Sequence, residues 1–294
     1  MICYNLKNHK KIIEIKNFNE EYITNYRHYL DTNNKRDLIM TLYWQINNIK
    51  IWNVYNWEII LNIEKVNNYG FINSACFLKD KNRIYIITSN CNYESSSEPI
   101  KIYDFNGNKI NEIINSEEKT LFVDVYYDEL LSKNFIISCN FNHVKTYNFQ
   151  NNKLYQKYYD NMNEGHHSAT INKNDNVVQL IESCIDGNIR IWDFHSGLLL
   201  NKIKVCENYF LYGLCLWNKK FLFIGCGDNT IKLIDLEKKL AIKNLIGYNM
   251  EVLTIKKIIH PEYGECIICQ GFLTEPIKVI INEKNSLYSR FNDI

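Results

Sequence analysis

The chain has 294 residues, 46% of them hydrophobic, and its 34 basic and 33 acidic residues leave a formal net charge of +1. This length can bury a large core, either in one large all-β domain or in two ordinary domains. The near-zero charge excludes a strong global attraction to nucleic acid or to an anionic membrane. With only 3 Pro and 11 Gly and no linker rich in them, the composition favours one continuous architecture.

The N-terminal stretch, residues 1–17, has no apolar segment long enough for a signal peptide, and no run approaches the ~20 apolar residues of a membrane helix. We therefore expect an intracellular, cytoplasmic protein without membrane insertion, and a nuclear location stays open. The ten Cys are scattered singly at strand-like positions such as Cys139, Cys215 and Cys226. We expect them to be reduced thiols that act as small hydrophobic residues.

One short pattern recurs along the chain. Its copies are IKIWN (49–53), IKIYD (100–104), VKTYN (144–148), IRIWD (189–193), IKLID (231–235) and IKVII (277–281). The last residues of these copies are separated by steps of 51, 44, 45, 42 and 46 residues. A period of about 40–45 residues is the length of one four-stranded blade of a β-propeller.

The same order of β-rich runs surrounds each copy of this marker. In the third copy the marker follows runs at 121–127 and 134–139, and in the fourth copy a further run follows it at 198–205. The runs predict strands a, b, c and d of a blade, with the marker as strand c. Alternation with a period of two dominates over helical spacing, so the sequence predicts an all-β fold. We expect a single domain over 1–294 with repeats at about 22–63, 71–115, 120–158, 166–204, 209–246 and 251–291.

The N-terminal residues 2–5 and 11–15 read like strands c and d of one more blade. Residues 1–15 are therefore expected to form a half blade. Either this half blade closes a six-bladed ring, or the chain is a seven-bladed propeller in which one blade lacks strands a and b. The second arrangement would leave unpaired strand edges.

Residues 165–193 carry a more specific set of motifs. Gly165 and His166 form a GH pair, Asp186 stands in the turn before the marker, and Trp192 with Asp193 ends it. His166 precedes Trp192 by 26 residues and Asp186 precedes it by six. In this order and spacing the chain resembles the WD-repeat family, and the degenerate markers extend the resemblance over nearly its whole length. The family's preference favours a seven-bladed propeller with one incomplete blade, with six closed blades as the alternative.

The resemblance implies that His166, Asp186 and Trp192 form a structural network, in which His166 bonds Asp186 and a strand-b hydroxyl continues to Trp192. The positions of those hydroxyls are Cys184 and Glu182 in this chain. Ser183 is one residue out of register and should face the opposite side of the sheet. A catalytic set of Ser183, His166 and Asp186 is therefore disfavoured, and we expect no catalytic residue.

We expect no cofactor and no metal site. Cys266 and Cys269 form a lone CxxC without a second pair of ligands, and His166 and His167 are adjacent rather than one helical turn apart. Neither of the glycine-rich motifs that bind nucleotide phosphates is present. Residues 90–100 lengthen one b to c connection, which favours a tolerated surface insertion over a recognition or phosphorylation site.

The family resemblance implies a non-catalytic scaffold or adaptor that binds protein partners in a larger complex, with no specific nucleic acid. In such a fold the d to a and b to c loops would form one rigid face suited to binding. By the family pattern, the residues expected on that face are Gln45, Ser168, Ile185, Gly227 and Met250. The alternatives are a substrate-recognition subunit of a protein-degradation complex and a propeller enzyme with a site in the central channel.

Overall fold

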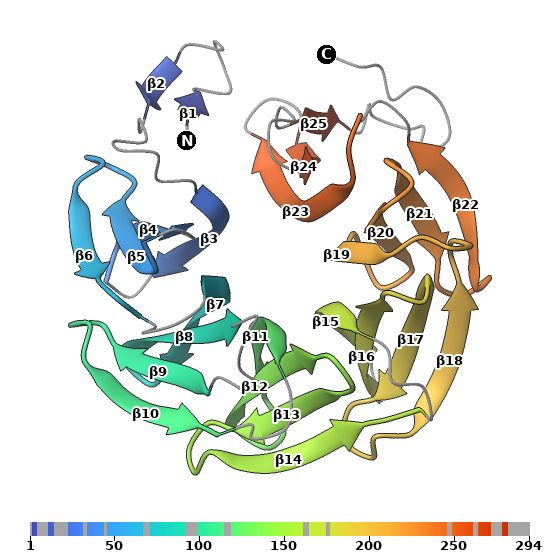
Figure 1. Ribbon diagram of the computed structural model, residues 1–294, viewed down its shortest axis with the longest axis horizontal. Coiled ribbons are helices and arrows are strands. Elements are labelled where there is room, and N and C mark those ends of the chain that lie inside the picture. The colour runs from blue at the N-terminus through green and yellow to red at the C-terminus, as the bar shows by residue number, and fades with distance from the viewer. Residues whose placement is uncertain are drawn as a thin grey trace. The chain divides into compact units, whose positions relative to one another are not determined.

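The computed structural model describes residues 2–4, 11–14, 23–31, 34–43, 46–66, 71–91, 99–114, 119–160, 165–174, 177–245, 249–260, 264–271 and 278–281. Every regular element in these ranges is a β-strand, as the sequence predicts (Figure 1). The chain divides into two compact units, one of Ile15–Tyr159 and the other of Ile2–Glu14 with Asp160–Ile294. Five four-stranded antiparallel sheets recur along it, an architecture consistent with the β-propeller-like class.

The unit of Ile15–Tyr159 contains three of the four-stranded sheets. In each sheet the strands pair in chain order, so every connection inside a sheet is a hairpin. The sheets are β3 (Ile23–Asp31), β4 (Arg36–Tyr43), β5 (Asn48–Asn53) and β6 (Ile59–Ile63); β7 (Phe71–Asp80), β8 (Arg83–Cys91), β9 (Ile100–Asp104) and β10 (Lys109–Ile113); and β11 (Thr120–Asp128), β12 (Lys133–Asn140), β13 (Val144–Asn148) and β14 (Lys153–Tyr158).

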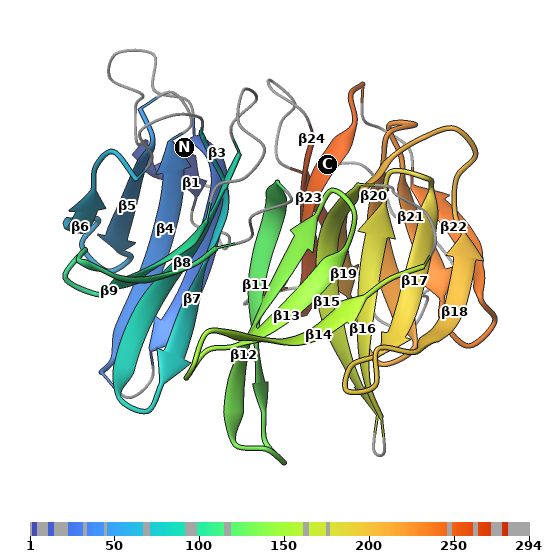
Figure 2. The ribbon, with the colours of Figure 1, turned by 60° about the horizontal axis from the view of Figure 1, so that its bottom comes forward.

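The second unit contains the other two four-stranded sheets and two smaller ones. Figure 2 shows its first sheet with the strands side by side in chain order. The four-stranded sheets are β15 (His166–Asn174), β16 (Val177–Cys184), β17 (Asn188–Asp193) and β18 (Leu199–Lys204), and β19 (Leu211–Leu216), β20 (Phe221–Cys226), β21 (Ile231–Asp235) and β22 (Leu240–Leu245). The smaller sheets are β23 (Val252–His260), β24 (Gly264–Gly271) and β25 (Lys278–Ile281), and the pair β1 (Ile2–Tyr4) and β2 (Lys11–Glu14).

The recurring marker lies in the third strand of all six larger sheets, and its register is constant. In every case the Lys or Arg of the marker stands directly opposite one residue of the second strand. These cross-strand pairs are Lys50–Thr41, Lys101–Thr88, Lys145–Ser138, Arg190–Glu182, Lys232–Ile224 and Lys278–Cys269. Because side chains alternate between the two faces of a strand, this shared register gives the sheets the same division into faces.

The core of each unit lies between neighbouring sheets. In the first unit, Leu38 and Ile51 of one sheet pack with Ile72 and Ile86 of the next. In the second unit, buried residues of β16 and β17 pack with those of β19 and β20. Burial of one such aliphatic side chain contributes about 1.5–3 kcal/mol, so each sheet depends on its neighbour to cover its apolar face.

Two glycines mark where β19 and β20 approach β23. A Cβ at Gly225 would overlap the carbonyl oxygen of Val252, and a Cβ at Gly213 would lie 2.6 Å from the carbonyl oxygen of Leu253. The obstacles are backbone atoms, which cannot turn away as a flexible side chain could. These positions therefore require glycine for close packing of the sheets.

We predict that Gly225→Ala lowers the free energy of unfolding by about 2–3 kcal/mol, because the added methyl group forces the two sheets apart. Urea denaturation followed by tryptophan fluorescence measures the change. Gly227→Ala is the matched control, since the nearest atom to its new Cβ lies 3.4 Å away. Equal stability of the two variants would contradict the close approach of β20 to β23.

Candidate functional site

A buried carboxylate joins the first three strands of the β15–β18 sheet. Nδ1 of His166, at the start of β15, lies 2.8 Å from Oε2 of Glu182 in β16. Nε1 of Trp192, in β17, donates to Oε1 of the same carboxylate at 2.9 Å. All three side chains are almost completely buried. Glu182 is thus the centre of a polar network in which each carboxylate oxygen has a donor from a different strand.

Asp186 does not take part in this network as the family resemblance implies. Its carboxylate instead accepts hydrogen bonds from Nη2 of Arg190 at 2.7 Å and from Nδ2 of Asn188 at 2.6 Å. Arg190 is fully buried and also bonds Asp160 through Nε at 2.6 Å, so its guanidinium charge is matched by two carboxylates. Glu182, with a longer side chain on the neighbouring strand, is the residue that reaches His166.

A related contact occurs in the first unit. There Nε1 of Trp52 donates to Oγ1 of Thr41 at 2.8 Å, and Thr41 faces the marker Lys50 as Glu182 faces Arg190. One register position therefore accepts the indole hydrogen in both sheets, with a hydroxyl in one and a carboxylate in the other. By the family pattern Glu182 stands at a position expected to carry a hydroxyl, and its carboxylate replaces that hydroxyl and bonds His166 as well.

The surroundings of this network disfavour nucleophilic chemistry. Sγ of Cys184 lies 3.5 Å from Nδ1 of His166, but burial, together with the charge of Glu182, raises the pKa of Cys184 well above its ordinary value. A reactive cysteine needs the opposite shift. Ser183 points elsewhere, since its Oγ donates to the carbonyl oxygen of Tyr212 at 2.6 Å. The described contacts do not bring Ser183, His166 and Asp186 together as a catalytic set.

Two groups of side chains have donor atoms of the kind that metals bind, each within 4.8 Å of one another. In the first group, His166 and Cys184 surround the Glu182 carboxylate, which already bonds two donors. In the second, Cys206 and Cys226 are joined to each other, and Asp228 bonds Lys232 and Thr230. The lone CxxC lies in β24, where Cys269 is buried and only the backbone of Cys266 is described.

We predict that Glu182→Ala lowers the free energy of unfolding by about 3 kcal/mol, because it leaves buried donors of His166 and Trp192 without their acceptor. Glu182→Gln should lower the free energy of unfolding by less, since its amide oxygen can still accept one of these hydrogen bonds. Thr41→Val is a matched control that removes the acceptor of one tryptophan only. Denaturant unfolding of the three variants should rank Glu182→Ala as the most destabilised, and a neutral effect would contradict the bridging role.

The residues expected on a partner-binding face lie in different environments. Gln45 is outside the described residues, and Ser168 is 7% exposed, with its carbonyl oxygen accepting a bond from Ser183. Burial between strands thus leaves Ser168 unsuited to a docking surface, which corrects the expectation. Ile185 and Gly227 are partly exposed at the turns after β16 and β20, and Met250 is 40% exposed.

An exposed aromatic pair, which no motif in the sequence indicates, lies beside these turns. Tyr209 and Phe210 precede β19 and are 49% and 48% exposed. The carbonyl oxygen of Phe210 accepts the backbone N–H of Gly227 at 2.9 Å. On the other side of that turn, Nδ2 of Asn229 donates to the carbonyl oxygen of Asn249 at 3.2 Å, next to Met250. We refer to Tyr209, Phe210, Gly227 and Met250 as the aromatic edge.

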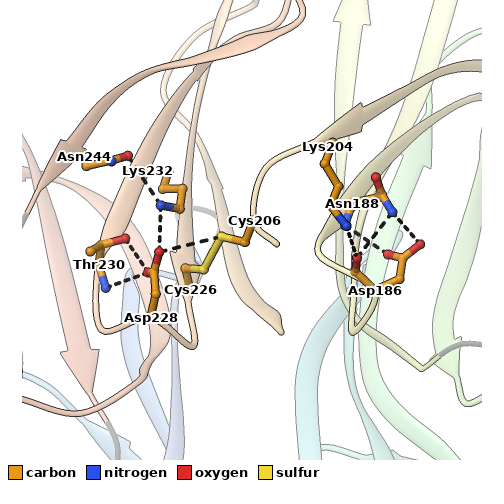
Figure 3. The surroundings of a disulfide bond; sticks show 9 residues. All are labelled: Asp186, Asn188, Lys204, Cys206, Cys226, Asp228, Thr230, Lys232 and Asn244. Carbon is orange, nitrogen blue, oxygen red and sulfur yellow. Dashed lines mark hydrogen bonds and ion pairs between the residues drawn. A yellow bond between two sulfur atoms is a disulfide. The ribbon is translucent and has the colours of Figure 1, made fainter. Parts of the chain in front are cut away.

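A disulfide between Cys206 and Cys226 holds the segment that carries the aromatic pair (Figure 3). This pairing differs from the reduced thiols expected from the sequence at these two positions, and Cys76, Cys139, Cys184, Cys215 and Cys269 are buried. The backbone of Cys206 also donates to the carbonyl oxygen of Gly187 at 3.2 Å. Gly187 has a positive φ of 74°, and a side chain there would overlap the carbonyl oxygen of Cys206. The segment before β19 is therefore fixed to the turns on both sides of it.

Next to this segment, the ring of His167 contacts Tyr212 with centroids 4.9 Å apart. Burial, assisted by the neighbouring His166, lowers the pKa of His167 to about 4. The neutral imidazole is therefore the form that the folded protein favours near pH 7. The phenol of Tyr212 donates to Oε2 of Glu251 at 2.7 Å, which connects this contact to the 249–251 segment.

We predict a loss of stability as the pH falls through the range in which His167 titrates. The folded-state pKa lies below the unfolded value of about 6.5, so the unfolded chain binds the proton first and the folded state loses stability on acidification. Between about pH 7 and pH 5 the contribution of His167 to the free energy of unfolding should fall by about 1–2 kcal/mol. His167→Gln should remove this part of the pH dependence of urea unfolding, and an unchanged dependence would contradict the assignment.

No protein-family model matches the chain, and no curated protein is significantly similar to it. In the part of the chain that the structure describes, there is no helix of the length and apolarity needed to span a membrane. Of the insertion at 90–100, residues 92–98 lie outside the described ranges, and the flanking strands β8 and β9 end and begin at Cys91 and Ile100.

Proposed function

We propose that this protein is a non-catalytic WD-repeat scaffold that binds a protein partner through the aromatic edge. Its sheets would be the blades of a seven-bladed propeller in which one blade is incomplete, with six closed blades as the alternative. The intracellular, cytoplasmic location expected from the sequence is part of the same proposal. The observation that carries the proposal is the exposure of Tyr209 and Phe210 on a segment that is otherwise held in place.

Exposed aromatic side chains are energetically suited to recognition. Tyr and Phe offer a large contact area with few rotatable bonds, and aromatic residues are enriched among the residues that dominate binding energy. Met250, on the other side of the Gly227 turn, adds an exposed flexible side chain of the kind that adapts to irregular surfaces. A partner side chain that covers these three residues would bury apolar area that now faces water.

The rigidity of the surrounding backbone also favours binding. The backbone hydrogen bonds from Cys206 to Gly187 and from Gly227 to Phe210 fix the segment before any partner arrives. A surface that is already ordered loses less conformational entropy on association than a mobile loop. The raised pKa of Cys184 and the backbone bond of Ser183 support the non-catalytic part of the proposal.

The proposal predicts that Tyr209→Ala with Phe210→Ala abolishes partner binding without unfolding the protein. The tagged full-length chain is isolated from its own cells, and co-purifying proteins are quantified by mass spectrometry. One complex should be recovered reproducibly with the wild type and be reduced at least about tenfold by the double variant, because both anchors are lost. The matched control is Leu154→Ala with Tyr155→Ala, which truncates an exposed pair on β14.

Recovery of the same complex with both double variants would contradict the role of the aromatic edge. Substrate turnover by the purified wild-type chain in an activity screen would contradict the non-catalytic assignment. Thermal unfolding of each variant checks that the variant is folded, so that a reduced recovery of the complex reflects the altered surface.

A further inference from the structure

A groove lies within the first unit, and none of its lining residues belongs to the aromatic edge. It consists of two adjoining hollows of about 500 and 590 Å³, which share Arg36, Phe105 and Asn106 in their walls. Strands β4, β6 and β8 and the turn between β9 and β10 all contribute to the walls. Both neighbouring sheets therefore shape the groove.

The turn that forms one wall is held rigidly. Oδ1 of Asp104 accepts the backbone N–H groups of Asn106 and Asn108 at 2.9 and 2.8 Å. Gly107 adopts a positive φ of 86°, and a Cβ at this position would lie 3.1 Å from Cδ1 of Leu61 in β6. The ring of Phe105 packs against the core between the two sheets. The groove is thus preformed rather than dependent on a mobile loop.

One part of the groove is cationic. Arg36 and Arg83 line it from the first residues of β4 and β8, and both are exposed. The guanidinium of Arg36 lies over the ring of Phe105, 5.4 Å from its centroid, which holds the cation at the junction of the two hollows. Asp104 is the acidic residue in the wall, and its carboxylate is occupied by the turn. Two arginines and one carboxylate that the turn already engages therefore line this part of the groove.

The other part of the groove is apolar. Ile60 is 44% exposed in one hollow and Ile110 is 49% exposed in the other. Leu61 and Phe105 lie beside them in the walls. Large aliphatic side chains that stay half exposed next to arginines form an amphipathic surface, and a ligand that covers it must combine negative charge with apolar bulk.

We propose that this groove binds an acidic peptide segment of a partner protein, in which Asp or Glu stands next to a bulky apolar residue. The carboxylates would pair with Arg36 and Arg83, since guanidinium groups bind carboxylates in a bidentate geometry. The apolar residue would cover Ile60, Ile110 and the exposed edge of Phe105. This second site goes beyond the proposed scaffold role, because it lies in the other unit and names the chemistry of its ligand.

Peptide display against the full-length protein tests the proposal. Enriched peptides should contain Asp or Glu beside a bulky apolar residue. A labelled synthetic copy of the most enriched peptide is then titrated by fluorescence polarisation. Arg36→Glu with Arg83→Glu should weaken its binding at least about tenfold, because two attractive charges become repulsive. Lys133→Glu with Lys153→Glu, the same charge change at exposed positions of the same unit, should leave binding within about twofold.

Two further measurements make the result specific. Replacing the acidic residues of the peptide by Lys should restore binding to the Arg36→Glu, Arg83→Glu protein and weaken binding to the wild type. Enriched peptides without acidic residues, or equal affinity for the wild type and the double arginine variant, would overturn the proposal. Arginine-dependent binding of an oligo(dT) strand with no enrichment of acidic peptides would overturn it in favour of a nucleic acid. Tyr209→Ala with Phe210→Ala should leave peptide binding unchanged, so this test and that of the scaffold proposal can fail separately.

Discussion

The register between the second and third strands is the constraint on which the rest of this structure depends. In all six larger sheets the marker cation stands opposite the same position of the second strand. A shift by one residue would turn every side chain of the marker to the other face and place charge where Ile51 or Ile191 now lies in the core. The burial of apolar side chains between neighbouring sheets and the positions of the turns both follow from this one pairing.

The same register explains which substitutions accompany one another among the repeats. Trp52 is paired with the acceptor Thr41, and Trp192 with the acceptor Glu182. In the β19–β22 sheet the corresponding positions are Ile234 and Ile224, and both are buried in one apolar cluster. A buried donor without an acceptor is costly, whereas an apolar pair of the right size has no such requirement. The β19–β22 repeat has therefore replaced both the tryptophan and its polar partner by apolar residues.

The strands could be predicted from the sequence because their signal is local. Alternation around the markers and the turn residues before them is sufficient to locate β9, β13 and β17 without knowledge of the tertiary structure. The contacts of the candidate site depend on residues that only the folded chain brings together. His166 and Asp186 have the family's spacing, yet the buried Arg190 engages Asp186 and leaves Glu182 as the partner of His166. The disulfide and the groove likewise join segments from adjoining elements, and no spacing in the sequence indicates either of them.

The disulfide also makes part of the polypeptide a covalent ring. Because Cys206 precedes β19 and Cys226 ends β20, the ring encloses the hairpin of these two strands, and 20 positions separate the bonded residues. A single cut by a protease at the β19–β20 turn would leave both fragments of the chain attached. They would migrate as one species on a denaturing gel until a reductant separates them.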